Sequence, residues 1–219
     1  MASSGIGRRR AAAKADGGAA YQQRRQEILQ TAARVFKERG LEGASLGQIA
    51  EAVGTDRASL YYYVGSRTEL FNDVVREPVR ANVEMAEAIC RKDVPAPAKL
   101  RELAANLMRS YADNYPFPYV YIQEDLSRLG DRGDEEAHEM NRRFDAAIIG
   151  IIEQGLADGS LRSDVPAREI AFGFIGMLNW THRWFDPDSA GADPAAIGDH
   201  FADIVLEGLA TRRSRRRSL

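Results

Sequence analysis

The clearest chemistry lies between residues 45 and 67, where arginine, serine and tyrosine recur at spacings suited to binding double-stranded DNA. Arg57 can donate two parallel hydrogen bonds to a guanine, Ser59 is a small polar contact, and Tyr62 can meet a thymine methyl group or a phosphate. Ser45 has a hydroxyl at a predicted helix start, where main-chain N–H groups attract a phosphate. Arg67 offers a cation at the start of a later helix. Together these groups predict a surface that reads base edges and holds the DNA backbone.

Two short helices joined by a tight turn must position these side chains. Apolar residues at i, i+3, i+4 and i+7 predict the first helix over Leu46–Val53, with Ser45 as its N-cap and Gly54 after its end. The second is expected over Arg57–Val64 and to end at Gly65. Its inward face carries Leu60 and Val64, and its outward face carries Arg57, Ala58 and Tyr62. This is the spacing of a helix-turn-helix, whose second helix enters the major groove.

Longer helices are expected on both sides of this pair. The spacing of apolar residues predicts one over Tyr21–Arg39, with Gly40 as its C-cap. Ser66 followed three residues later by Glu69 matches a capping box, so another helix is expected from Arg67 to about Ile89. Pro78 should kink or break that helix, because proline lacks the N–H of the helical hydrogen bond.

The rest of the chain also shows helical periodicity, and no stretch alternates in the manner of a strand. The further helices are expected to span about 95–115, 116–130, 134–158, 166–185 and 194–211. The predicted fold class is therefore all-α, with about nine helices.

Residues 24–76 resemble the DNA-binding domain of tetracycline-repressor (TetR) family regulators. The resemblance rests on Arg24-Arg25-Gln26-Glu27-Ile28-Leu29, on Gly54, and on the run from Leu60 to Leu70, which reads LYYYVGSRTEL. It implies a helix-turn-helix domain at residues 21–66 and a ligand-binding and dimerisation domain at 67–211, flanked by a basic arm (1–20) and a basic tail (212–219). The DNA-binding residues it implies are Ser45, Leu46, Gly47, Arg57, Ala58, Ser59, Tyr61, Tyr62, Tyr63 and Arg67. Family members often carry a polar or basic side chain at the position of Gly47.

The same resemblance implies a homodimer that binds a palindromic DNA operator, and a small-molecule effector that releases it. Dimerisation is expected from the last two helices, through Phe172, Phe174, Ile175, Leu178, Phe201, Ile204, Val205 and Leu209. Residues 179–187 are similar to a segment of family members that sense acyl-CoA thioesters, which makes an acyl-CoA a candidate effector. The expected pocket residues are Leu103, Leu107, Tyr111, Tyr119, Ile122, Phe144, Ile148, Met177, Trp180 and Trp184.

Composition and charge fit a cytoplasmic DNA-binding protein. The 219 residues carry a net charge of −2, but residues 1–76 hold 12 basic and 8 acidic side chains, residues 77–210 hold 13 and 24, and residues 211–219 hold 5 and 0. The longest nearly apolar run has nine residues, Ile170–Leu178, whereas a membrane span needs about 20. One cysteine, Cys90, rules out an internal disulfide, and no signal peptide is expected.

The sequence gives little support to an enzymatic or metal-binding function. No nucleophile elbow, phosphate-binding loop or dinucleotide motif occurs, so we expect no enzymatic activity and no cofactor. Glu135 and His138 have the i, i+3 spacing used in di-iron bundles, but such sites need two of these motifs and the chain has one. His182 and His200 have no nearby His or Cys at ligand spacing, so no metal site is expected. The alternatives are a helical acyl-CoA carrier or enzyme without specific DNA binding, and an architectural protein that binds DNA without sequence preference. The arginines of the two ends could add nonspecific DNA affinity or be solvated.

Overall fold

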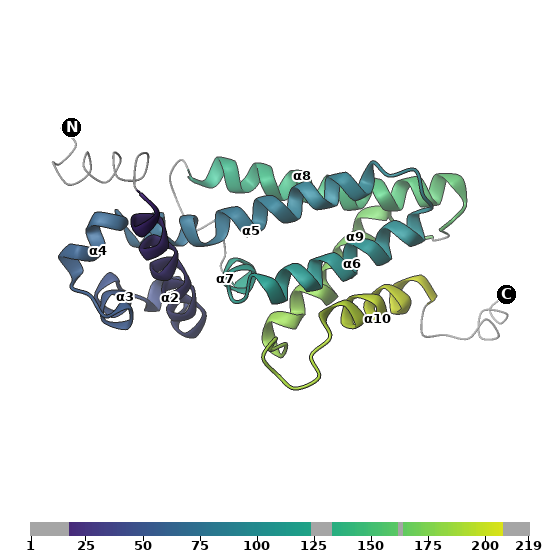
Figure 1. Ribbon diagram of the computed structural model, residues 1–219. Helices are drawn as coiled ribbons and strands as arrows, with labels where there is room; N and C mark the ends of the chain where they lie inside the picture. Colours follow the sequence, from purple (N-terminus) through teal and green to yellow (C-terminus); the bar gives the residue numbers. More distant parts are fainter. Residues whose placement is uncertain (1–17, 124–132, 162–163, 208–219) are drawn as a thin grey trace. The chain divides into compact units, whose positions relative to one another are not determined.

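A computed structural model describes residues 18–123, 133–161 and 164–207 (Figure 1). Across these residues the chain forms nine α-helices, one short 3-10 turn and no strand, which confirms the all-α fold class. The helices are α2 (Ala19–Gly43), α3 (Leu46–Val53), α4 (Arg57–Tyr63), α5 (Arg67–Cys90), α6 (Ala96–Asp113), α7 (Phe117–Gln123), α8 (Gly133–Asp158), α9 (Ala167–Trp180) and α10 (Pro194–Glu207), with the 3-10 turn at Thr181–Arg183. None of the described helices is long and apolar enough to cross a membrane.

The chain divides into two compact units. The first comprises residues up to Val79 together with Asn114–Ala137, and the second comprises Arg80–Asp113 together with the chain from His138 onward. The division therefore falls inside α5 and not between residues 66 and 67, where the sequence suggested a domain limit. The reason is burial, because the first turns of α5 place Leu70, Phe71, Val74 and Val75 in the core.

The core of the first unit is built from α2, α3, α4 and the start of α5. The rings of Phe36 on α2 and Phe71 on α5 meet edge to face, with centroids 5.6 Å apart. Ile49 of α3 and Leu60 of α4 are completely or almost completely buried. α7 packs against α2, and the Lys37 ammonium lies 4.0 Å from the centre of the Tyr115 ring just before α7. The segment after α6 thus belongs to the same body as the short helices.

The second unit is held together by close packing of α6 against α10 (Figure 1). Gly198 of α10 lies so near the main chain of α6 that an added Cβ would come within 2.5 Å of the Ala104 carbonyl oxygen. On the other side, the buried Lys99 ammonium donates to the Cys90 carbonyl (2.7 Å) and to Gln154 Oε1 (2.5 Å). These bonds join α6 to the end of α5 and to α8.

Most helix limits lie where the sequence predicts them, and the differences have local causes. At Gly40 φ is +68°, so the regular helix is interrupted there, yet one more helical turn follows to Gly43. α5 runs through Pro78 without a break. α9 stops at Trp180, and the chain continues as the 3-10 turn instead of as α-helix to Phe185. The expected helical residues 124–130 and 208–211, most of the basic arm, and the basic tail lie outside the described residues.

Candidate DNA-binding site and effector region

The first helix of the pair is fixed at both ends by its own sequence. Ser45 Oγ accepts a hydrogen bond from the Gln48 N–H (3.2 Å), and the Ser45 N–H donates to Gln48 Oε1 (2.9 Å), which completes a capping box. Gly54 ends α3 in the left-handed conformation (φ +73°), which favours glycine. The start of α3 is therefore rigid, and its Ser45 hydroxyl is exposed, as expected for a phosphate contact.

The second helix begins at an N-cap that the sequence analysis did not identify. Asp56 Oδ1 accepts from the Ser59 N–H (2.8 Å), and Asp56 Oδ2 accepts from the Ser59 hydroxyl (2.7 Å). The hydroxyl bond, followed by the main-chain bond, lowers the pKa of Asp56 below its ordinary value. The signal in the sequence was the Asp-x-x-Ser spacing after Gly54. Ser59 is exposed, but its hydroxyl serves this cap in the free protein.

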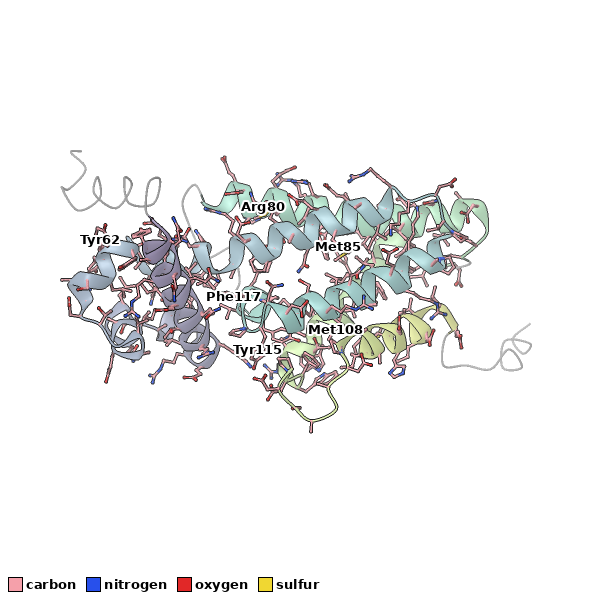
Figure 2. All side chains as sticks on the ribbon, viewed as in Figure 1. Tyr62, Arg80, Met85, Met108, Tyr115 and Phe117 are labelled. Atoms are coloured by element: carbon pink, nitrogen blue, oxygen red, sulfur yellow. The ribbon has the colours of Figure 1, made fainter. Side chains whose placement is uncertain are left out.

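The outer face of α4 carries the predicted base-contacting groups. Arg57, Ala58 and Tyr62 are exposed, whereas Leu60 and Val64 are buried, as the spacing predicts. The Arg57 guanidinium donates to the Tyr61 hydroxyl (3.1 Å), which holds the arginine along the helix. Figure 2 shows the Tyr62 side chain on this part of the chain. The arrangement presents one arginine fork and one phenol to a ligand outside the unit.

An aromatic cluster fixes the end of α4 on the first turn of α2. The Tyr63 ring stacks on Tyr21 with a centroid distance of 5.0 Å, and Tyr62 meets Tyr21 and Tyr63 edge to face at 5.7 and 5.1 Å. Tyr61 and Tyr63 are consequently only half exposed. Tyr21 has a positioning role that helical periodicity alone could not show.

Three of the expected DNA-binding residues are placed differently from the rest. Leu46 is buried, with 8% of its surface exposed, so its side chain belongs to the core. Gly47 is exposed, and an added Cβ would make only an ordinary contact with Ser45 Oγ at 3.8 Å, so this position has room for a side chain. Arg67 is half-buried and donates to acceptors within its own unit.

The ten expected pocket residues are divided between the two units. Tyr119 and Ile122 lie on α7 in the first unit, and the other eight lie in the second unit. Leu103, Leu107 and Ile148 are buried, and Phe144 and Met177 are half-buried. Tyr111 is buried on α6, and its hydroxyl donates to Asn179 Oδ1 of α9 (2.7 Å). The partner that its hydroxyl required is thus supplied by the chain itself.

The two tryptophans lie on the surface and not in the interior. Trp180 is 59% exposed and Trp184 is 54% exposed, because the inward positions of this segment are taken by Leu178, Thr181 and Phe185. The Thr181 hydroxyl donates to the Leu178 carbonyl (2.6 Å) and approaches Met108 Sδ at 3.8 Å on α6. An open hollow of about 400 Å³ adjoins Trp184 and is lined by Phe185, Asp186, residues 189–193 and the first turns of α10.

The surface of α9 and α10 also corrects the expected dimerisation residues. Phe174 and Leu178 are almost completely buried in their own chain, so they pack in the core. Phe172 and Ile204 are exposed, and Ile175, Phe201 and Val205 are half-buried. Leu209 lies outside the described residues. The exposed large apolar side chains of this region are Phe172, Trp180, Trp184 and Ile204, and we refer to them as the α9–α10 surface.

A capped pair of short helices on a three-helix core, with an arginine and a phenol on the outer face, defines a helix-turn-helix DNA-binding protein. Comparison with known families supports this class along the chain. Residues 28–74 match the family "Bacterial regulatory proteins, tetR family", and residues 93–209 match "Tetracyclin repressor-like, C-terminal domain". The chain belongs to the TetR family of transcriptional regulators.

Individual relatives are similar to this chain over most of its length. The HTH-type transcriptional repressor KstR2 of Rhodococcus jostii strain RHA1 is 28% identical over 189 residues, which cover 86% of this chain and 92% of that repressor. The crystal structure of the probable transcriptional regulatory protein RHA5900 is similar with a TM-score of 0.78 at 26% identity, covering 85% of this chain and 99% of that one. The regulator AibR, solved in complex with isovaleryl coenzyme A and operator DNA, has the same fold, with a TM-score of 0.70 at 21% identity, covering 84% of this chain and 98% of that one.

Proposed function

We propose that this regulator is a homodimeric repressor that binds a palindromic operator through α3 and α4 and leaves it when an apolar effector, with an acyl-CoA as the leading candidate, binds the second unit. The observation that carries the proposal is the outer face of α4, where Arg57, Ala58 and Tyr62 are exposed on a helix fixed by Asp56 and by the tyrosine cluster. Such a helix can enter a major groove without being reordered.

The base-reading role of Arg57 gives a direct test. Replacing Arg57 by Ala should weaken binding to the preferred operator by about 5- to 150-fold and relax the preference at one base pair per half-site, because the bidentate contact to guanine is lost. Operator binding by fluorescence anisotropy, with a set of single-base operator variants, measures both effects. Arg34→Ala, which removes an exposed cation from α2, is the control. A uniform loss across all operator variants would show that Arg57 contacts the backbone and not a base.

The effector assignment rests on the second unit and on the relatives. Leu103, Leu107 and Tyr111 of α6 and Ile148 of α8 are buried, so the second unit has a largely apolar core, which suits an acyl chain. AibR was crystallised with an acyl-CoA and operator DNA together, which makes this effector class the first to test. Release of labelled operator by a series of acyl-CoA thioesters, with free CoA as the control, would identify the acyl group that is recognised.

The proposed dimer uses the α9–α10 surface. Four large apolar side chains are exposed: Phe172 and Trp180 on α9, Trp184 directly after the 3-10 turn, and Ile204 on α10. Exposed aromatic residues grouped on neighbouring elements are typical of protein interfaces. A dimer through this region would carry two recognition helices, as a palindromic operator requires.

Two features of the chain can couple the effector region to DNA binding. α5 belongs to both units, and the division between them falls one residue after Pro78. α7, which lies between α6 and α8 in the sequence, packs on α2. A change at α6 or α8 is therefore transmitted along α5 and through α7, and the effector acts by favouring one of two conformers.

Pro78 is the proposed site of bending in α5. Pro78→Ala restores the N–H that can bond to the Val74 carbonyl and stiffens the helix. We expect the acyl-CoA concentration needed for half-release of the operator to change by about 2- to 30-fold, with little change in operator affinity without effector. Titration of the operator complex with the acyl-CoA that releases the wild-type protein measures the first quantity, and direct binding measures the second. Equal changes in both would count against bending at this residue.

Within the part of the chain that the structure describes, the second candidate function, an acyl-CoA carrier or enzyme, is supported only by the apolar core of the second unit. Turnover assays on the same thioesters would show product formation in that case. We assign the chain no catalytic activity.

A further inference from the structure

Arg67 differs from the other expected DNA contacts because its guanidinium already has three acceptors inside the first unit. Nη1 donates to the Glu42 carbonyl (3.0 Å) and to the Ala44 carbonyl (3.2 Å), and Nη2 donates to Glu42 Oε2 (3.1 Å). Only about a third of its side-chain surface is exposed (32%). Its position at the start of a helix predicts a phosphate contact for this cation, and the geometry does not favour one.

The acceptors belong to Glu42 and Ala44, at the end of α2 and just before α3, and we refer to residues 42–45 as the α2–α3 corner. After the interruption at Gly40, the chain makes one further turn and then becomes extended at Ala44, immediately before the N-cap Ser45. Carbonyl groups at the end of a helix lack helical partners, and an arginine that binds two of them satisfies those groups. Ala44 is also buried, so the corner is held from inside by packing and from outside by Arg67.

Arg67 itself is firmly anchored. It is the first residue of α5, whose start is capped by a hydrogen bond from the Glu69 N–H to Ser66 Oγ (3.0 Å). Leu70 and Phe71, one turn further on, are completely buried. The guanidinium therefore joins a fixed point on α5 to the residue that precedes the phosphate-facing end of α3.

We propose that Arg67 is a positioning residue that holds the N-terminus of α3 in its DNA-binding orientation through the Glu42 and Ala44 carbonyls, and that it does not bind a DNA phosphate. The inference rests on the proposed DNA binding by α3 and α4 and deepens it. Only arginine has the planar fork that reaches two carbonyls and a carboxylate at once, whereas a lysine ammonium acts as a point charge. The same guanidinium also forms an ion pair with the exposed Glu42 carboxylate.

The substitutions Arg67→Lys and Arg67→Gln separate the two roles. Without DNA, both should increase hydrogen exchange at the amides of residues 44–50, including the Gln48 N–H bonded to Ser45 Oγ, because the corner is released. With operator DNA, both should weaken binding by about fivefold or more. The slope of log affinity against log salt should stay at the wild-type value even for Arg67→Gln. Arg34→Gln, an exposed cation on α2, is the control for loss of charge.

A direct phosphate contact gives a different pattern. Arg67→Gln would then reduce the magnitude of the salt slope by about 0.9, Arg67→Lys would bind like the wild type, and exchange in the free protein would be unchanged for both. Unchanged exchange overturns the proposal even where affinity falls. If Arg67→Gln fails to fold, the Arg67→Lys variant alone decides the question. Faster amide exchange at residues 44–50 in that variant supports the positioning role of Arg67. Amide exchange and operator affinity equal to those of the wild type refute it. If the wild type shows no sequence-specific DNA binding, the proposed function is refuted. The exchange measurement on the free protein would then still test whether Arg67 holds the N-terminus of α3.

Discussion

The double substitution Phe172→Asp with Ile204→Asp is expected to give a folded monomer whose affinity for the palindromic operator is lower by about 1000-fold or more. Both side chains are exposed, at 41% and 38%, so placing a carboxylate there leaves the core of the second unit intact. Within a dimer interface the same carboxylates would be desolvated without partners, which strongly opposes association. A monomer engages one half-site, and the gap between specific and nonspecific binding is about 10³-fold or larger.

Sedimentation velocity and operator binding on the same samples test this prediction, with circular dichroism to show that the variant is folded. The matched control is Val94→Asp, an equally exposed apolar residue (38%) between α5 and α6, outside the α9–α10 surface. The control should remain dimeric with wild-type affinity. A doubly substituted protein that stays dimeric would place the interface elsewhere.

Exchanging Gly198 for alanine is expected to destabilise the second unit. The new Cβ would lie 2.5 Å from the Ala104 carbonyl oxygen and 2.7 Å from the Ala105 nitrogen, both main-chain atoms that cannot rotate away. α6 and α10 must separate to admit it, and overpacking of this kind costs about 1–3 kcal/mol. The midpoint of thermal unfolding should fall by about 2–12 °C at fixed protein concentration.

Gly150→Ala provides the comparison for this loss. It adds the same methyl group to α8, where the nearest atom outside the helix, Cys90 Sγ, would lie at an ordinary contact distance of 3.5 Å. Because glycine inside a helix is less favourable than alanine, this variant should be neutral or more stable by up to about 1 kcal/mol. Equal unfolding midpoints for the two variants would show that α6 and α10 do not pack as closely as described.

Local signals in the sequence were sufficient to predict the short helices of the first unit. Ser45 and Gly54 mark the limits of α3 through a side-chain cap and a left-handed residue, and both signals depend on residues within one turn. The inward positions of Leu60 and Val64 follow from helical spacing alone. These elements are specified by neighbours in the chain, so no knowledge of tertiary packing was needed.

Features that depend on packing between distant segments could not be predicted from local sequence signals. The family resemblance placed Leu46 among the DNA contacts, but the residue is buried on the apolar face that its helical spacing indicates. The association of α7 with α2, and the carbonyl partners of Arg67, join residues far apart in the sequence. Trp180 and Trp184 were expected to line a pocket, where a ligand could pair with the indole N–H, yet both are exposed because Leu178, Thr181 and Phe185 take the inward positions.

The most direct test of the central claim is selection of bound fragments from sheared genomic DNA by the purified protein at near-physiological salt, followed by sequencing. The account predicts enrichment of a palindromic motif whose half-sites are about one helical turn apart, or a multiple of it, with the motif lost for Arg57→Ala. A folded, dimeric protein that enriches no motif would contradict it.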